Sequence, residues 1–102
     1  MTDKECFVVN NDTINSITFR KNKLLSKILL PDNLLFIGDA AFSFCMSLRQ
    51  ICIPASVQFV GVAAFCKSGL EEVVFKGVPK IIEPSIFIGC KHLKKVLVPM
   101  GQ

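Results

Sequence analysis

The stretch ICIPASVQFVGVAAF, residues 51–65, decides the fold of this chain because its features recur at a nearly fixed spacing. Its first isoleucine, Ile51, has counterparts in Ile28 before it and Val73 after it. Its proline has a counterpart in Pro31 at the same spacing. This period of about 23 residues lies within the range of roughly 20–50 residues that is typical of solenoids and repeat arrays. Two further groups recur in the same way: Phe42, Phe65 and Phe87, and Leu48, Leu70 and Leu93.

The spacing divides the 102 residues into copies within a single domain, 1–102. A one-residue deletion at 67–70 shortens the middle full copy. The first copy keeps the apolar positions but loses the proline and glycine, as expected of a terminal repeat that packs on one side only. The predicted copies are a degraded N-terminal repeat at 4–26, full repeats at 27–49, 50–71 and 72–94, and a truncated C-terminal repeat at 95–102.

Each copy predicts one coil of a solenoid. Ile51 and Ile53 alternate with Cys52, which is strand spacing, and Pro54 ends the strand because it has no N–H to donate. Residues 39–45 predict a short helical turn with Asp39 as its N-cap. No copy can bury its own apolar residues, so we expect stacked coils with one shared core and parallel strands about 4.8 Å apart.

The motifs ICIPASV at 51–57 and AFSFCMSL at 41–48 resemble the BspA-like leucine-rich repeats. The resemblance covers roughly residues 27–99 and, more weakly, 4–26. It implies an α/β fold: a right-handed leucine-rich repeat solenoid with a parallel β-sheet on the concave face and short helical turns and extended segments on the other sides. The copy at 72–94 departs from the pattern, because Lys76 replaces the proline and Glu83 the glycine.

The resemblance implies a non-catalytic binding or adhesion module, since members of this family are mostly described in those terms, many on microbial and bacterial surfaces. It offers no catalytic residues to transfer. The alternative is a structural fragment or cap of a larger repeat protein with no ligand of its own, which predicts apolar surface at the C-terminal end of the stack.

The strand residues between the inward-facing ones are predicted to form the concave surface. One column of this surface is apolar, whereas the flanking columns carry charges of both signs. An apolar stripe with a polar rim is typical of a protein contact, although Val, Leu and Cys also simply suit strands. The apolar column is predicted to hold Cys6, Leu29, Cys52, Val74 and Leu97. The predicted partner-binding residues are Leu29, Arg49, Gln50, Cys52, Glu71, Glu72, Val74, Lys94, Lys95 and Leu97, with Asp3 and Lys4 flanking the first copy.

The five cysteines are predicted to be free thiols. Cys45 and Cys90 share one phase two copies apart, about 10 Å by strand spacing, whereas a disulfide needs Cα atoms within about 7 Å. Both are expected in the core. His92 is the only histidine, and a catalytic pair with Cys90 would lack a third orienting group. We therefore predict no catalytic site, no metal site and no cofactor.

Composition excludes several function classes. The net charge is +4, yet we interpret the basic clusters at 20–23 and 91–95 as solvated corners, because nucleic-acid binding requires a denser basic face with stacking aromatics. No apolar run reaches the length of a membrane span. The polar start at 1–5 is unlike a secretory signal, so the chain is expected in the cytoplasm if complete, and at the cell surface or secreted if a fragment.

The C-terminal end of the stack is the last feature that the sequence singles out. Lys95–Pro99 is predicted to be the final strand, with an unpaired edge that invites pairing. We expect either an end-to-end homodimer through this strand or a longer natural chain. The partner of the concave face is expected to be a protein, whose identity the sequence leaves open.

Overall fold

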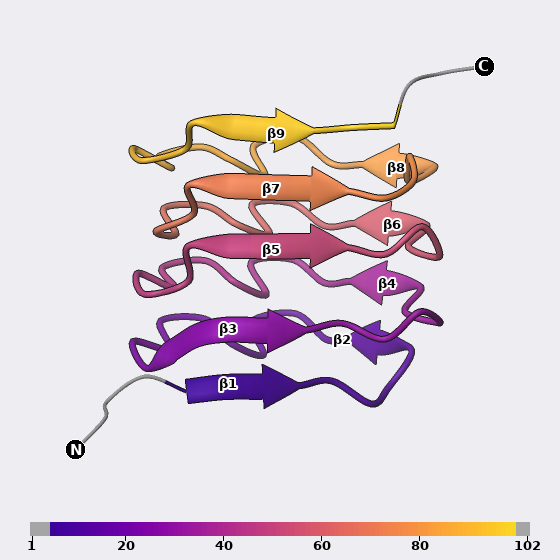
Figure 1. Cartoon of the computed structure of the whole chain (residues 1–102), viewed down its shortest axis with the longest axis horizontal. Coiled ribbons are helices and arrows are strands. Elements are labelled where there is room, and N and C mark those ends of the chain that lie inside the picture. Colours follow the sequence, from indigo (N-terminus) through magenta and orange to yellow (C-terminus); the bar gives the residue numbers. More distant parts are fainter. Residues whose placement is uncertain (1–4, 100–102) are drawn as a thin grey trace.

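The computed structural model describes residues 5–99 as a stack of coils, each built from a long strand and a short strand (Figure 1). The long strands run side by side along one side of the stack, and the short strands lie behind them and run the opposite way (Figure 1). This is a parallel-strand solenoid, as predicted. The long strands are β1 (Glu5–Val8), β3 (Leu25–Leu29), β5 (Gln50–Ile53), β7 (Glu72–Phe75) and β9 (Lys95–Leu97), and the short strands are β2 (Thr13–Ile14), β4 (Phe36–Ile37), β6 (Phe59–Val60) and β8 (Ile81–Ile82).

The register of the long strands follows the repeat spacing. In the ladder β5–β7–β9, Ile51 pairs with Val73, and Val73 pairs with Val96. All pairings are parallel, so the same phase of each copy points the same way. Ile51 and Val73 point into the core and are buried.

The long-strand sheet is interrupted between β3 and β5. β1 pairs with β3, and β5 pairs with β7 and β9, but no ladder joins β3 to β5 among the described residues. Pro54, at the end of β5, has no N–H to donate towards β3. In the next coil Lys76 stands in the proline slot, and its N–H donates to the Ile53 carbonyl at 2.9 Å. The departure from the repeat pattern at Lys76 therefore extends the ladder of β5 and β7.

The first coil is two residues shorter at its corner than the repeat spacing predicts. Val8 pairs with Leu29 and Ile14 pairs with Ile37, so the partners in the first pair lie two positions closer in the sequence than those in the second. The prediction that Cys6 shares the phase of Leu29 is therefore wrong, because Cys6 pairs with Lys27. Val8 takes the predicted place of Cys6. The predicted flanking residues Asp3 and Lys4 lie outside the described residues.

Phenylalanine rings form a continuous column through the core. Phe19, Phe42, Phe65 and Phe87 stack on one another with centroids 5.2, 5.4 and 5.9 Å apart. Phe42 and Phe65, in the middle, are fully buried. A second set of rings, Phe36 and Phe59, stacks at 4.7 Å on the short strands.

The predicted helical turns, and with them the α/β class, are wrong for the described residues, which contain no helix. Seven of the described non-glycine residues have positive φ, and they recur with the repeat, as at Ala40 (54°) and Ala63 (58°). This left-handed conformation interrupts a right-handed helix. Alternate N–H groups consequently bond to the next coil: that of Phe42 donates to the Ala64 carbonyl, at 2.8 Å.

Asp39 also acts differently from the predicted N-cap. Its carboxylate oxygen Oδ1 accepts a hydrogen bond from the N–H of Val62 in the following coil, at 2.9 Å. The side chain thus joins two coils instead of starting a helix. Backbone and side-chain bonds between coils replace the intrahelical bonds that the sequence led us to expect.

Candidate functional site

The outward side of the long strands, called the strand face below, carries an apolar column with one residue from each long strand. Cys52 pairs with Val74, and Val74 pairs with Leu97, so these three side chains lie in register across β5, β7 and β9. Val8 and Leu29 occupy the same phase on β1 and β3. Leu29 is 48% exposed and Leu97 45% exposed. The apolar column therefore consists of Val8, Leu29, Cys52, Val74 and Leu97.

Charged and polar residues border the apolar column on the side where the strands begin. Gln50 pairs with Glu72, and Glu72 pairs with Lys95, so the charge changes along this row. A second row lies one residue earlier. It holds Arg49, Glu71 and Lys94, whose backbones are hydrogen-bonded to one another. The N–H of Glu71 donates to the Arg49 carbonyl at 2.7 Å, and the N–H of Lys94 donates to the Glu71 carbonyl at 2.8 Å.

One ion pair lies within these rows in the described part of the chain. Nη1 of Arg49 is 3.6 Å from Oε2 of Glu71, and both side chains are about half exposed. An exposed pair of this kind contributes little to stability, about 0–1 kcal/mol, so both charges remain available to a partner. Lys94 and Lys95 are exposed at the C-terminal end of the same rows. Of the ten predicted partner-binding residues, Leu29, Gln50, Cys52, Glu72, Val74, Lys95 and Leu97 lie on the long strands, and Arg49, Glu71 and Lys94 lie directly before them.

Two shallow hollows on the strand face were missed by the sequence reasoning. Each has a volume of about 190 Å³, and both lie where the ladder between β3 and β5 is interrupted. Leu29 and Cys52 border both of them. The proline at the end of β5 was the available signal, since it removes a ladder donor there. The hollows are also lined by Lys27, Ile28, Leu30, Asp32, Gln50, Ile51, Pro54, Glu72, Val74 and Lys76.

The cysteines are free thiols, as predicted. Cys45 is buried, and its Sγ donates to the Phe19 carbonyl of the preceding coil at 3.0 Å; Cys90, half-buried, does the same to Phe65. Burial raises the pKa of the Cys45 thiol to about 11, while contact with the backbone of Asn22 opposes the rise. These two thiols are therefore structural hydrogen-bond donors between coils.

His92 lies at a coil corner, as predicted, beside Lys91 and Gly89. The Cys90 thiol donates to the Phe65 carbonyl and lies 3.6 Å from the Ser68 hydroxyl, so these contacts of the thiol do not include His92. Within residues 5–99, no cluster of three or more His, Cys, Asp or Glu side chains could hold a metal ion. The same part of the chain contains no helix long and apolar enough to cross a membrane.

Comparison with known families agrees with the repeat geometry. A family model described as "BspA type Leucine rich repeat region (6 copies)" matches residues 10–101. Comparisons with curated proteins and with solved structures gave no match.

Proposed function

The chain belongs to the BspA-type leucine-rich repeat family, and from this premise we propose that it is a protein-interaction module that binds a macromolecular partner through its strand face. The family is generally a non-catalytic repeat scaffold. We propose that this chain likewise has no enzymatic activity. Adhesion is one biological role that such a module could serve, since repeat proteins of this family are commonly interaction or adhesion proteins.

The apolar column is the single observation that carries the proposal. In a solvent-facing strand position polar residues cost nothing, yet each of the five coils presents Val, Leu or Cys there. Leu29 and Leu97 each expose nearly half of their side-chain surface. Burial of such a stripe by a partner would contribute about 25 cal/mol for each Å² of apolar surface removed from water.

The charged rows indicate what the partner surface should look like. Arg49, Lys94 and Lys95 favour acidic groups, while Glu71 and Glu72 in the middle favour a basic one. Charges that border an apolar contact mainly set specificity and the rate of association. The proposed partner therefore presents an apolar ridge flanked by an acidic–basic–acidic sequence of side chains.

The experiment is affinity capture from cell and host-matrix extracts with the immobilised chain, followed by identification of the retained proteins. The test variant is Cys52→Asp/Val74→Lys, which charges the middle of the apolar column without changing the net charge. The matched control is Val62→Asp/Val78→Lys, which places the same two charges at exposed valines outside the strand face. Circular dichroism confirms that all three proteins are folded.

The proposal expects a partner that the wild type and the control retain and that the strand-face variant loses. Retention of the same partners by all three proteins would exclude the strand face as the binding surface. Loss from both variants would point to a general effect of charge and would equally contradict the proposal.

A second candidate function rests on the C-terminal end of the described stack. Ile82 is 44% exposed and Val96 40% exposed, whereas their counterparts Val60 and Val73, one coil earlier, are fully buried. We propose that another coil covers this end, either as part of a larger repeat protein or from a second copy of the chain. In that role the domain is a structural unit, and the strand-face variant would leave its assembly unchanged.

A further inference from the structure

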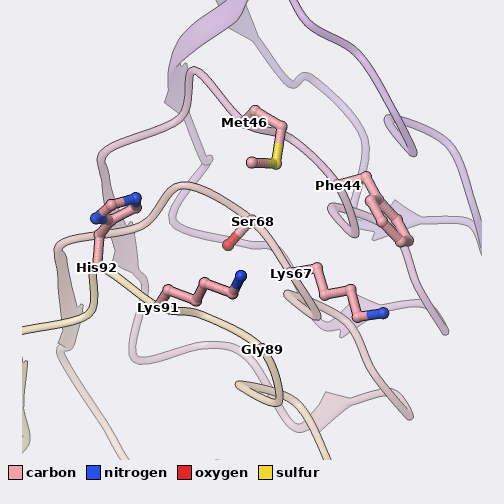
Figure 2. Close-up of a pocket in the computed structure, with 7 residues that line it drawn as sticks. All are labelled: Phe44, Met46, Lys67, Ser68, Gly89, Lys91 and His92. Carbon is pink, nitrogen blue, oxygen red and sulfur yellow. The ribbon is translucent and has the colours of Figure 1, made fainter.

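The one-residue deletion in the middle full copy shapes a hollow on a different side of the molecule from the strand face. The loop before the repeated leucine has two residues in each neighbouring coil: Met46 and Ser47 before Leu48, and Lys91 and His92 before Leu93. In the middle coil Gly69 alone stands there. The shorter loop leaves a hollow of about 280 Å³ between the two longer ones (Figure 2).

Glycines permit the short loop and keep the hollow open. A Cβ on Gly69 would collide with the backbone carbonyl oxygen of Met46, and the Gly69 N–H donates to the Cys45 carbonyl at 3.0 Å. Gly89 has a φ of 73° and occupies the phase in which the preceding coil carries Lys67. Gly89 has no side chain, so the last coil adds none at this position. The aliphatic part of Lys67 lies directly over the glycine, where a Cβ would collide with it.

The lining combines apolar surface with positive charge. Met46 is 52% exposed, and Phe44 lies under the ammonium group of Lys67, with Nζ 5.5 Å from the ring centroid. Lys91 extends from the last coil into the middle of the hollow, and His92 stands at one end (Figure 2). No acidic side chain lines the hollow among the described residues, and neither lysine has an ion pair there.

We propose that this hollow binds a small carboxylate that carries an apolar group. The carboxylate would meet Lys91, whose ammonium group points into the hollow, and the apolar group would lie against Met46 (Figure 2). Lys67 is directed away from Lys91 towards the Phe44 ring and adds positive charge at the edge of the hollow. The volume of about 280 Å³ lies just below the range of ligand sites, roughly 300–1,000 Å³, and so suits at most a single ring or a short aliphatic chain. The same chemistry is found in a free arylalkanoic acid and in a peptide C-terminus that ends in an apolar residue.

The test is a titration of the ¹⁵N-labelled full chain, followed by the backbone amide signals of Ser68, Gly69 and Gly89. The probes are 4-phenylbutyrate and N-acetylglycyl-phenylalanine, each compared with its own uncharged carboxamide. We expect saturable shifts of these signals with at least one acid and weaker binding of its carboxamide. A response to phenylbutyrate alone identifies free acids as the ligand class, and a response to the peptide identifies C-termini.

Lys91→Glu should weaken binding by about fivefold or more, because it replaces an attraction with a repulsion. Lys80→Glu makes the same charge change outside the lining and should leave the affinity within about twofold of wild type. Absence of shifts with both acids, equal binding of acid and carboxamide, or equal effects of the two variants would each overturn the proposal. The strand-face proposal is unaffected by any of these results, since it concerns other residues.

Discussion

The rings of Phe42 and Phe65 lie face to face in adjacent coils, with centroids 5.4 Å apart and planes 10° from parallel. Neither side chain is exposed. Each also stacks on a further ring on its other side, Phe19 for the first and Phe87 for the second. Loss of either central ring therefore removes contacts in three coils at once.

Phe65→Ala is expected to lower the free energy of unfolding by about 3–5 kcal/mol, the range found when a buried phenylalanine is truncated. Urea denaturation followed by circular dichroism measures this loss. Phe36→Ala removes the same ring from a position that is 36% exposed and should cost clearly less. A melting temperature of Phe65→Ala within about two degrees of wild type would contradict the predicted core register.

Cys45 should make stability fall at alkaline pH. Its pKa is raised from 9.0 to about 11 in the folded protein, so the folded state favours the protonated thiol. The stabilisation is complete below pH 9, the unfolded pKa, and disappears as the pH rises through about 11. A rise of the Cys45 pKa from 9.0 to about 11 corresponds to a loss of at most about 2–3 kcal/mol in the free energy of unfolding.

The measurement is urea denaturation at pH 8 and pH 10.5, on wild type and on Cys45→Ala. All other ionisable groups are the same in the two proteins. The wild type should therefore lose more stability than the variant between the two pH values. An identical pH dependence in both proteins would show that the thiol does not contribute.

Lys76→Pro restores the proline of the repeat pattern and should destabilise the protein. The N–H of Lys76 donates to the Ile53 carbonyl, and proline would remove that donor between β5 and β7. We expect a loss of about 1 kcal/mol in urea denaturation, with Lys76→Ala close to wild type as the control for the lost side chain. A gain in stability for the proline variant would mean that the hydrogen bond is unimportant.

Self-association through the C-terminal end is expected to grow with protein concentration. Val96 in β9 and Val98 directly after it are exposed, and β9 pairs only with β7 in the described part of the chain. Sedimentation velocity over a range of concentrations should show a dimer for the wild type. Val96→Lys should abolish it, whereas Val62→Lys should not, because Val62 follows β6, which pairs with a strand on each side. A wild-type protein that remains monomeric at every concentration would contradict this contact.

The repeat period determined most of the architecture that could be predicted. Because Ile51, Val73 and Val96 share one phase, their parallel pairing followed directly from their spacing. Prediction failed where a residue's conformation depends on the neighbouring coil. Alanine is the strongest helix former and phenylalanine a moderate one, but bonds to the next coil hold Ala40 and Phe44 in the left-handed region, with φ of 54° and 60°.

The apolar column was also predictable from the repeat period. The prediction was wrong at Cys6, where the first coil departs from that period. Leu29, Cys52 and Val74 lie in full copies and Leu97 directly follows one, so the repeat spacing places all four in one phase. Cys6 does not share this phase, because the corner of the first coil is two residues shorter and no proline marks where the strand ends. The hollow beside Gly69 could not be predicted from the sequence. The deletion shows that one loop is shorter, but it does not show whether the longer loops on either side close over the gap.

The most direct test of the strand face is the affinity of the captured partner, measured by calorimetry for three proteins: wild type, Cys52→Asp/Val74→Lys and Val62→Asp/Val78→Lys. We expect the strand-face variant to bind at least about tenfold more weakly, a loss of about 1.4 kcal/mol, and the control to bind within about twofold of wild type. Equal affinity of the strand-face variant and the wild type, with both folded, would contradict the claim that this chain binds through its apolar column.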